Sequence, residues 1–218
     1  TGDAPLNEVL AAGMILLSGW KGESDFLDPM CGSGTLPIEA AMIAKNIPPG
    51  KLRKSFAFMN WRDFDSELFE KIKEEAQPLP FNHTIHASDL LAKNIISART
   101  NARNARVFNL IQFNVTDFGK LELPLTDSVV IINPPYGERM TGSHLNQLYS
   151  MVGERLKHHF AGNTAWVLSS SNELIQKIGL KPSLKIKLFN GSLECSFLKF
   201  DLFEGKRKLV VIRKQQKS

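Results

Sequence analysis

The sequence lacks the features that would place it in a membrane, in an oxidising compartment or around a structural metal. It has no apolar run near the ~20 residues of a membrane-spanning helix and no signal-peptide pattern at its start. Its two cysteines, Cys31 and Cys195, lie far apart and show no CxxC spacing. A disulfide framework or a zinc site is therefore not expected, and we predict a cytoplasmic protein without a metal.

Most of the chain also lacks an excess of one charge. The net charge of +5 comes from residues 206–218, which hold six basic side chains and no acid, whereas the remainder carries 21 basic and 22 acidic residues. The basic tail could contact phosphates. We favour the alternative that Leu209–Ile212 is an edge strand whose ends are guarded by lysines.

What the sequence does contain is an alternation of strand and helix patterns. Helical spacing of apolar residues predicts helices within 4–18, 38–44, 63–76, 90–105, 145–160 and 172–178. Short β-branched or aromatic runs predict strands at 26–27, 84–89, 108–115, 129–132 and 165–168, followed by strands 183–189 and 194–203 around an Asn-Gly hairpin signal. The pattern predicts an α/β, Rossmann-like, doubly wound and mostly parallel sheet that ends in an antiparallel hairpin.

A glycine-containing loop, Asp28-Pro-Met-Cys-Gly-Ser-Gly-Thr35, follows the first predicted strand. Gly32 and Gly34 would let the backbone approach a ligand and turn sharply into a helix. The loop has no lysine of the GxxxxGK[ST] type, and the carboxylate of Asp28 would face the ligand. This anion favours a cationic ligand, such as an amino group or a sulfonium centre, over a phosphate.

Two further carboxylates follow the next strands. Asp89 ends the second strand, where an acid in this topology accepts hydrogen bonds from the ribose hydroxyls of a nucleotide. Asp117 follows the third strand and could accept from an adenine amino group, or it could cap its own backbone. Three carboxylates at successive strand ends suit a ligand with an amino acid, a ribose and an adenine. We therefore predict S-adenosylmethionine as the cofactor.

The fourth strand, Val129–Ile132, runs into Asn133-Pro134-Pro135-Tyr136. Taken alone, this is a strand stopped by prolines. In an open parallel sheet, however, ligands bind beyond the carboxyl ends of the strands. The side-chain carbonyl of Asn133 and the backbone carbonyl of Pro134 could hold the hydrogens of an exocyclic amine, and Tyr136 could stack on a flipped-out base.

Residues 47–80 interrupt the alternation. Asp28 and Asp89 lie 61 residues apart, whereas about 20 residues is usual between a glycine loop and its ribose-binding acid. We therefore interpret 47–80 as an insertion on a single methyltransferase domain, 1–218. It contains a helix that we expect Asp63 to cap, and we expect Phe56, Phe58 and Trp61 to anchor it in the core. The cations that could clamp RNA are Lys51, Arg53, Lys54 and Arg62.

The order of these motifs resembles class I methyltransferases that act on exocyclic amines of bases. The stretches APLNEVLAA, DPMCGSGTLPIEAAMIAKNIPPG, NPPYGERM and FNGSLECSFLKF are, more narrowly, similar to bacterial guanine-N2 methyltransferases of large-subunit rRNA. That resemblance implies an rRNA substrate and an upstream THUMP RNA-binding domain. No THUMP sequence is present here, which would fit a fragment that starts at Thr1.

The resemblance also implies the site residues. Catalytic roles fall to Asn133, Pro134 and Tyr136, and Arg139 would contact a phosphate or a base. Cofactor contacts would come from Leu6, Asp28, Pro29, Met30, Cys31, Gly32, Ser33, Gly34, Thr35, Asp89, Asp117 and Asn133. The alternatives are N6-adenine methylation of nucleic acid, methylation of a protein glutamine, and a non-catalytic RNA-binding or assembly module. A glutamine is an alternative because its carboxamide nitrogen, like an exocyclic amine of a base, is a poor nucleophile.

Overall fold

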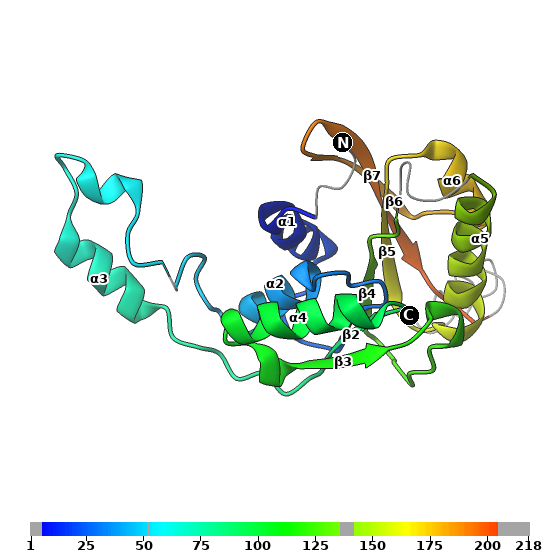
Figure 1. Ribbon diagram of the computed structural model, residues 1–218, viewed down its shortest axis with the longest axis horizontal. Coiled ribbons are helices and arrows are strands. Elements are labelled where there is room, and N and C mark those ends of the chain that lie inside the picture. The colour runs from blue at the N-terminus through cyan, green and yellow to red at the C-terminus, as the bar shows by residue number, and fades with distance from the viewer. Residues whose placement is uncertain (1–5, 52, 136–141, 205–218) are drawn as a thin grey trace, which may run out of the picture.

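The computed structural model describes residues 6–51, 53–135 and 142–204. Within these residues, the strands form one seven-stranded sheet of order β3-β2-β1-β4-β5-β7-β6 (Figure 1). Strands β1 to β5 run parallel, and β7 is antiparallel to both β5 and β6. This confirms the predicted doubly wound sheet with an antiparallel C-terminal hairpin. The strands are β1 Phe26–Asp28, β2 Ile85–Asp89, β3 Ile111–Val115, β4 Val129–Ile132, β5 Thr164–Ser169, β6 Leu184–Asn190 and β7 Leu193–Asp201.

Helices cover both faces of the sheet (Figure 1). The α-helices are α1 Glu8–Ser18, α2 Thr35–Ala44, α3 Ser66–Glu75, α4 Ala92–Asn104, α5 Gly142–His159 and α6 Asn172–Lys177. Helices α1, α2 and α4 pack on one face and share a core with Ile131, whereas α5 and α6 share the opposite core with Val130 and Ile132. Strand β4 is therefore apolar throughout because successive side chains enter different cores.

Several predicted boundaries were wrong, and two of them have a visible local reason. The third strand begins at Ile111 rather than at 108, because Phe108–Leu110 forms a 3-10 turn (η2). Helix α3 is capped by Asp65 rather than by Asp63, since the Asp65 Oδ1 accepts from the Leu68 N–H at 2.9 Å. Helix α5 begins at Gly142 rather than at 145. The predicted edge strand Leu209–Ile212 lies outside the described residues.

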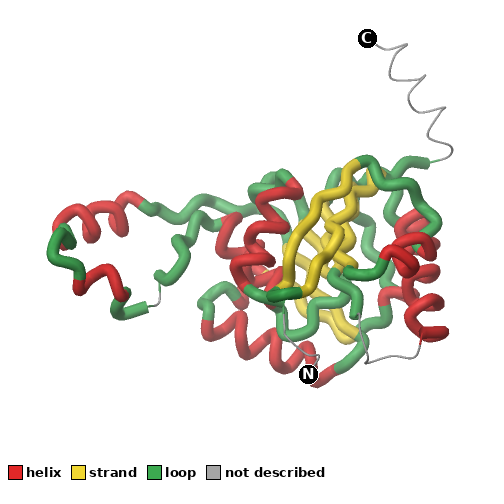
Figure 2. Tube along the Cα trace, turned by 90° about the horizontal axis from the view of Figure 1, so that it is seen from above, coloured by secondary structure: helices red, strands yellow, loops and turns green. Residues whose placement is uncertain are grey.

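Residues 47–80 form an arm that projects away from the sheet (Figures 1 and 2). The prediction that its aromatic residues anchor it in the core was wrong. Phe56, Phe58, Phe64 and Phe69 instead pack on one another with ring centroids 5.1–6.0 Å apart, and Trp61 is 67% exposed. No residue of α3 or of the 3-10 helix η1 (Ala57–Asn60) is buried. The arm therefore has a small core of its own.

Candidate active site

Asp28, Asp89 and Asn133 lie at or immediately after the carboxyl ends of β1, β2 and β4. These strands are parallel neighbours in the sheet, with β1 in the centre. Their carboxyl ends therefore meet at one edge, as a binding crevice of this topology requires. The sequence predicted this convergence correctly.

The glycine loop bridges β1 and α2 and is held against β2. The Cys31 N–H donates to the Ser88 carbonyl at 2.9 Å. Gly34 has φ +88 and packs so closely on α4 that an added Cβ would lie 2.9 Å from the Ala98 Cβ. Gly32 has φ +53, and no atom lies within 4 Å of the position that its Cβ would take. Gly34 thus serves helix packing, whereas Gly32 borders open space.

Asp28 is buried in the floor of this edge and is 1% exposed. Its Oδ1 accepts from the Met30 N–H at 3.1 Å. Burial raises the pKa of Asp28 to about 8, with a smaller contribution from the negative charge of Asp89, and the Met30 hydrogen bond opposes this rise. At neutral pH the carboxyl is therefore mostly protonated. A cation bound beside it would favour the ionised form, so the site fits a cationic ligand.

Asp89 connects the loop to α4. Among the described residues, its Oδ1 accepts from the Leu91 N–H and the Asn94 Nδ2, both at 2.9 Å, and its Oδ2 accepts from the Gly32 N–H at 3.0 Å. A carboxylate offers about four acceptor positions. The observed pattern leaves room for one hydroxyl, so binding both hydroxyls of a ribose requires the Gly32 N–H to move from Oδ2.

Asp117 follows β3 and precedes the 3-10 turn Phe118–Lys120 (η3). Its Oδ1 accepts from the Gly119 N–H at 2.8 Å. This is the local backbone cap that the sequence left open as the alternative reading. The predicted contact with an adenine amino group stays a proposal.

Asn133 contributes an unsatisfied acceptor to this edge, its Oδ1, which is one of five buried side-chain polar atoms without a hydrogen-bond partner among the described residues. Leaving such an acceptor unpaired costs about 1–3 kcal/mol, which is offset when a ligand donates to it. Pro134 is buried beside it. Tyr136 and Arg139, to which the sequence assigned roles, lie outside the described residues.

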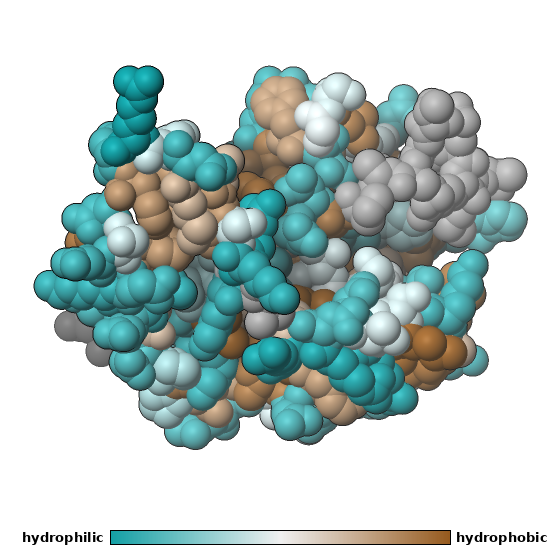
Figure 3. All heavy atoms as spheres, turned by 60° about the vertical axis from the view of Figure 1, so that its left-hand side comes forward, coloured by the Kyte–Doolittle hydropathy of each residue, from teal (hydrophilic) through white to brown (hydrophobic). Residues whose placement is uncertain are grey.

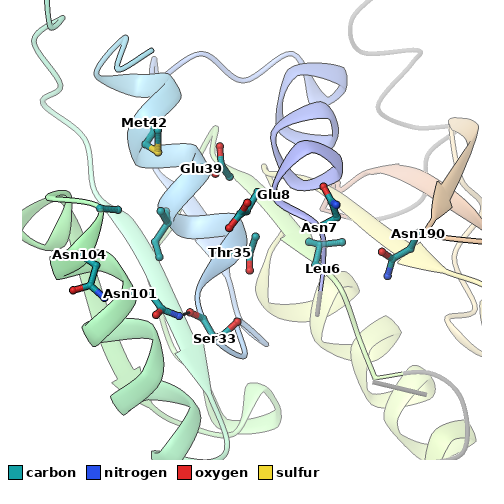
Figure 4. A pocket seen from close by; sticks show the side chains of 13 residues that line it. Leu6, Asn7, Glu8, Ser33, Thr35, Glu39, Met42, Asn101, Asn104 and Asn190 are labelled. Carbon is teal, nitrogen blue, oxygen red and sulfur yellow. Dashed lines mark hydrogen bonds between the residues drawn. The ribbon is translucent and has the colours of Figure 1, made fainter. Parts of the chain in front are cut away.

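A groove of about 710 Å³ lies on the outer side of the glycine loop (Figure 4). Leu6, Ser33 and Thr35, three predicted cofactor residues, line it together with side chains of α1, α2, α4 and the turn between β6 and β7. Glu39 faces Glu8 across this groove, and burial, followed by the charge of Glu8, raises the pKa of Glu39. The predicted cofactor residues therefore fall into two groups, one in the groove and one at the strand ends.

The remaining loop residues and the arm cations occupy different surroundings. Burial raises the pKa of the Cys31 thiol, and Asp28 and Asp89 raise it further, so the thiol stays protonated. Pro29 is buried and Met30 is half-buried in the same loop. The predicted RNA contacts Lys51, Arg53, Lys54 and Arg62 all lie on the arm, so the structure does not bring them to the strand-end site.

Comparison with known protein families gives this site its context. Residues 1–199 match the UPF0020 family, described as an RMKL-like methyltransferase domain. The chain belongs to this family. Membership confirms the predicted class of enzyme, a methyltransferase, and agrees with S-adenosylmethionine as its cofactor.

Individual relatives of this RMKL-like domain are also named as methyltransferases or methylases. The ribosomal RNA large subunit methyltransferase K/L of Shewanella oneidensis is 42% identical over 205 residues, which cover 90% of this chain but 29% of the relative. The solved structure of SMU.472 complexed with SAH is 33% identical, with a TM-score of 0.85, over 94% of this chain and 55% of that one. A structure named as a predicted N6-adenine-specific DNA methylase from Listeria monocytogenes is 32% identical, with a TM-score of 0.77, over 92% of this chain and 52% of that one.

Sequence reasoning missed one residue that contacts the candidate site, Asn94. It lies in the first turn of α4, whose N-cap Leu91 has no capping side chain, and its Nδ2 donates to Asp89. An amide five residues after a strand-end acid, at the start of a helix, is the only signal that could have indicated this contact.

Two further kinds of feature are absent from the part of the chain that the structure describes. No described helix is both long enough and apolar enough to cross a membrane. Among the same residues, no three His, Cys, Asp or Glu side chains are grouped so that they could hold a metal ion.

Proposed function

We propose that this chain transfers the methyl group of S-adenosylmethionine to the exocyclic N2 amine of a guanine in large-subunit rRNA. The observation that carries the proposal is the buried, unpartnered Oδ1 of Asn133 beside Pro134, at the strand edge that also holds Asp28 and Asp89. An acceptor in this position can receive a hydrogen from an amine. The similarity to the K/L methyltransferases supports large-subunit rRNA as the substrate.

Asn133 and Pro134 would prepare the amine for reaction. The lone pair of an aromatic amine is delocalised into its ring, which makes the amine a poor nucleophile. The Asn133 Oδ1 and the Pro134 carbonyl would accept its two hydrogens and direct the nitrogen lone pair away from the ring plane. When bound, the cofactor supplies an electrophilic methyl group on a sulfonium. Orienting two reactants in this way can contribute about 7–11 kcal/mol.

The strand-end acids would hold the cofactor. The ionised form of Asp28 would pair with a cationic group, and Asp89 would accept from the ribose while Asn94 fixes its orientation. Asp117 would bind the adenine amine through the acceptor positions that its own cap leaves free. Leu6, Ser33 and Thr35 would border the cofactor from the groove side.

The RNA side of the proposal rests on the resemblance and on the arm. Tyr136 would stack on the flipped base, and Arg139 would contact a phosphate or a base. The full-length protein would carry an upstream THUMP domain and work in the cytoplasm, where the two free, buried cysteines would stay reduced. The chain spans 29% of the length of its K/L relative, so these partners belong to the proposal.

Methylation of adenine N6 is the second candidate. The Listeria relative is named for that activity, and the Asn-Pro carbonyls would hold an adenine amine in the same way. The two candidates differ in which base carries the amine and in whether that base belongs to RNA or to DNA.

One experiment separates the candidates and tests the role of Asn133. The chain is incubated with a labelled methyl donor and either undermodified large-subunit rRNA or DNA, and the labelled nucleoside is identified by mass spectrometry. We expect N2-methylguanine from the RNA; N6-methyladenine would overturn the substrate assignment.

Asn133→Ala should reduce transfer at least about a hundredfold, since the lost acceptor orients the nucleophile, and should lower the affinity for S-adenosylhomocysteine far less in calorimetry. The matched control is Asn109→Ala, which removes an exposed amide from the turn before β3. Equal loss of transfer and of affinity in the Asn133 variant would contradict its assigned role.

A further inference from the structure

The arm is attached at the edge of the sheet opposite the candidate active site. Helix α2 starts at the carboxyl end of β1 and leads away from it, and β2 starts from the opposite edge. The arm is the connection between these two elements, so it leaves and re-enters the body at the amino ends of the strands. Its base is tied by the Leu79 N–H, which donates to the Lys45 carbonyl at 3.1 Å, and by the Asn46 Nδ2, which donates to the Gln77 carbonyl at 3.2 Å.

The arm contributes little to the core of the body, since Ile47 at its base is the one described residue of 47–80 that packs on that core. Among the ring contacts of the described residues, its phenylalanines pack only with one another and with Trp61, Arg53 and Lys73, all of which belong to the arm. Ordering a segment of this length costs about 1–2 kcal/mol for each residue in backbone entropy. An arm whose surface is largely exposed recovers little of that cost by burial. Its exposed side chains are therefore free to contact a partner outside the body.

The charges of the arm are divided along its length. Residues 51–62 carry four cations and no acid, whereas 63–75 carry six acids and two cations. The four cations Lys51, Arg53, Lys54 and Arg62 are exposed, and none of them forms an ion pair among the described residues. The acids of α3 therefore leave these cations available for an anionic partner.

An exposed aromatic face lies within the same segment. The Trp61 ring rests on Phe58 at a centroid distance of 6.3 Å, and 67% of the residue is open to solvent. The Arg53 guanidinium lies 5.5 Å from the centroid of the Phe56 ring. Figure 3, which turns this side of the molecule forward, shows hydrophobic and hydrophilic residues next to one another on the surface. Cations beside an open ring are the combination that binds unpaired nucleotides, through phosphate contacts and base stacking.

We propose that residues 51–62 bind unpaired RNA at a position remote from the methylated base. The inference that this RNA belongs to the substrate rests on the proposed function. The arm and the strand-end site would then hold two parts of one RNA. The arm would determine how strongly the RNA binds, and Asn133 would act only on the base that is methylated.

Fluorescence anisotropy with an unpaired RNA oligonucleotide tests the arm without requiring methyl transfer. Lys51→Glu with Lys54→Glu should weaken binding about tenfold or more and reduce the slope of log affinity against log salt by about 1.4, since each phosphate contact to a single strand contributes about 0.7. Trp61→Ala should weaken binding about tenfold. The matched control is Lys177→Glu with Lys181→Glu, which makes the same charge change at two exposed lysines outside the arm. Retained binding of S-adenosylhomocysteine would show that the variants are folded.

The outcomes separate this inference from the proposed function. If the arm variants bind RNA as the parent does, or if the control loses as much, the arm is not an RNA site and a protein partner is the better occupant. With rRNA as substrate, the arm variants should raise KM and leave kcat unchanged, and an equal fall in kcat would overturn the remote position. A parent chain that binds the oligonucleotide through the arm but methylates no RNA would overturn the proposed function alone.

Discussion

The strand-end site and the arm are built in opposite ways. At the site, polar groups are buried in the body and held by backbone hydrogen bonds, as Asp28 and Asp89 are. On the arm, polar and aromatic side chains alike stay partly or fully exposed around a small core. A site that orients reacting atoms needs the first construction, whereas a surface that holds a flexible chain by charge and stacking works with the second. The difference predicts how each region responds to substitution.

The largest expected difference between the two regions is between the buried carboxyl of Asp28 at the site and an exposed carboxyl of the arm. Because the pKa of Asp28 is about 8 in the folded chain and near 3.9 when unfolded, the folded state holds the extra proton between these pH values. The contribution of Asp28 to the free energy of unfolding therefore falls as pH rises from about 4 to about 8, by at most about 1.4 kcal/mol per pH unit, and is flat above that range. Asp28→Asn should remove this slope, so the variant should be several kcal/mol more stable than the parent at pH 9.

The same variant should bind S-adenosylhomocysteine much more weakly, because the amide cannot become an anion beside the ligand's ammonium group. Urea unfolding from pH 4 to 9 and calorimetry measure the two effects. Glu74→Gln, which neutralises an exposed carboxyl of the arm, is the matched control. A parent whose stability does not fall across this range would show that Asp28 is ionised in the free protein.

Two glycines give the next contrast, because both have a positive φ and both lack room for a Cβ. A Cβ on Gly34 would meet the Cα of Ala98 at 3.1 Å as well as its Cβ, and a helix backbone cannot move aside. A Cβ on Gly50 would lie 2.8 Å from the Phe56 ring, which is half-buried and can turn. We expect Gly34→Ala to cost about 3 kcal/mol and Gly50→Ala about 1 kcal/mol. Thermal unfolding measures both, and equal costs would mean that the arm is packed as rigidly as the body.

The sequence predicts the parts of this molecule that follow from pattern and topology. The apolar run of β4, the loop at Gly32 and the acid at Asp89 could be placed because parallel strands bring their carboxyl ends together. The link from Asn94 to Asp89 could not, since it depends on the orientation of one side chain in a helix turn. The aromatic residues of the arm were assigned to the wrong core because hydrophobicity predicts burial without saying against what. Asp117 shows a similar limit of sequence reasoning. An aspartate that caps its own loop and an aspartate that binds a ligand look the same in the sequence.

Asn94 allows a sharper test of how the strand-end site orients Asp89. Removing its donor in Asn94→Ala should loosen the Asp89 carboxylate and weaken S-adenosylhomocysteine binding about ten- to a hundredfold, as expected for the 1.5–3 kcal/mol of a hydrogen bond to a charged group. The loss should nearly vanish for an analogue that lacks both ribose hydroxyls, because Asp89 then has nothing to orient. The control Thr100→Ala removes a hydroxyl from the same helix that donates to the Ile96 carbonyl rather than to the acid. An equal loss for both ligands would mean that Asn94 only stabilises the fold.

Removal of the arm should have the smallest effect on the body. Replacing residues 51–76 with a short Gly-Ser linker keeps Lys45, Asn46, Gln77 and Leu79, which form the hydrogen bonds at its base. Since no residue of η1 or α3 is buried, the change mainly shortens a loop, and halving a loop alters closure entropy by only about 0.6 kcal/mol. Thermal stability and S-adenosylhomocysteine affinity should stay near those of the parent while RNA binding falls. A large drop in stability would show that the arm supports the sheet, and its exposed cations and Trp61 would then lose their value as evidence for a separate RNA contact.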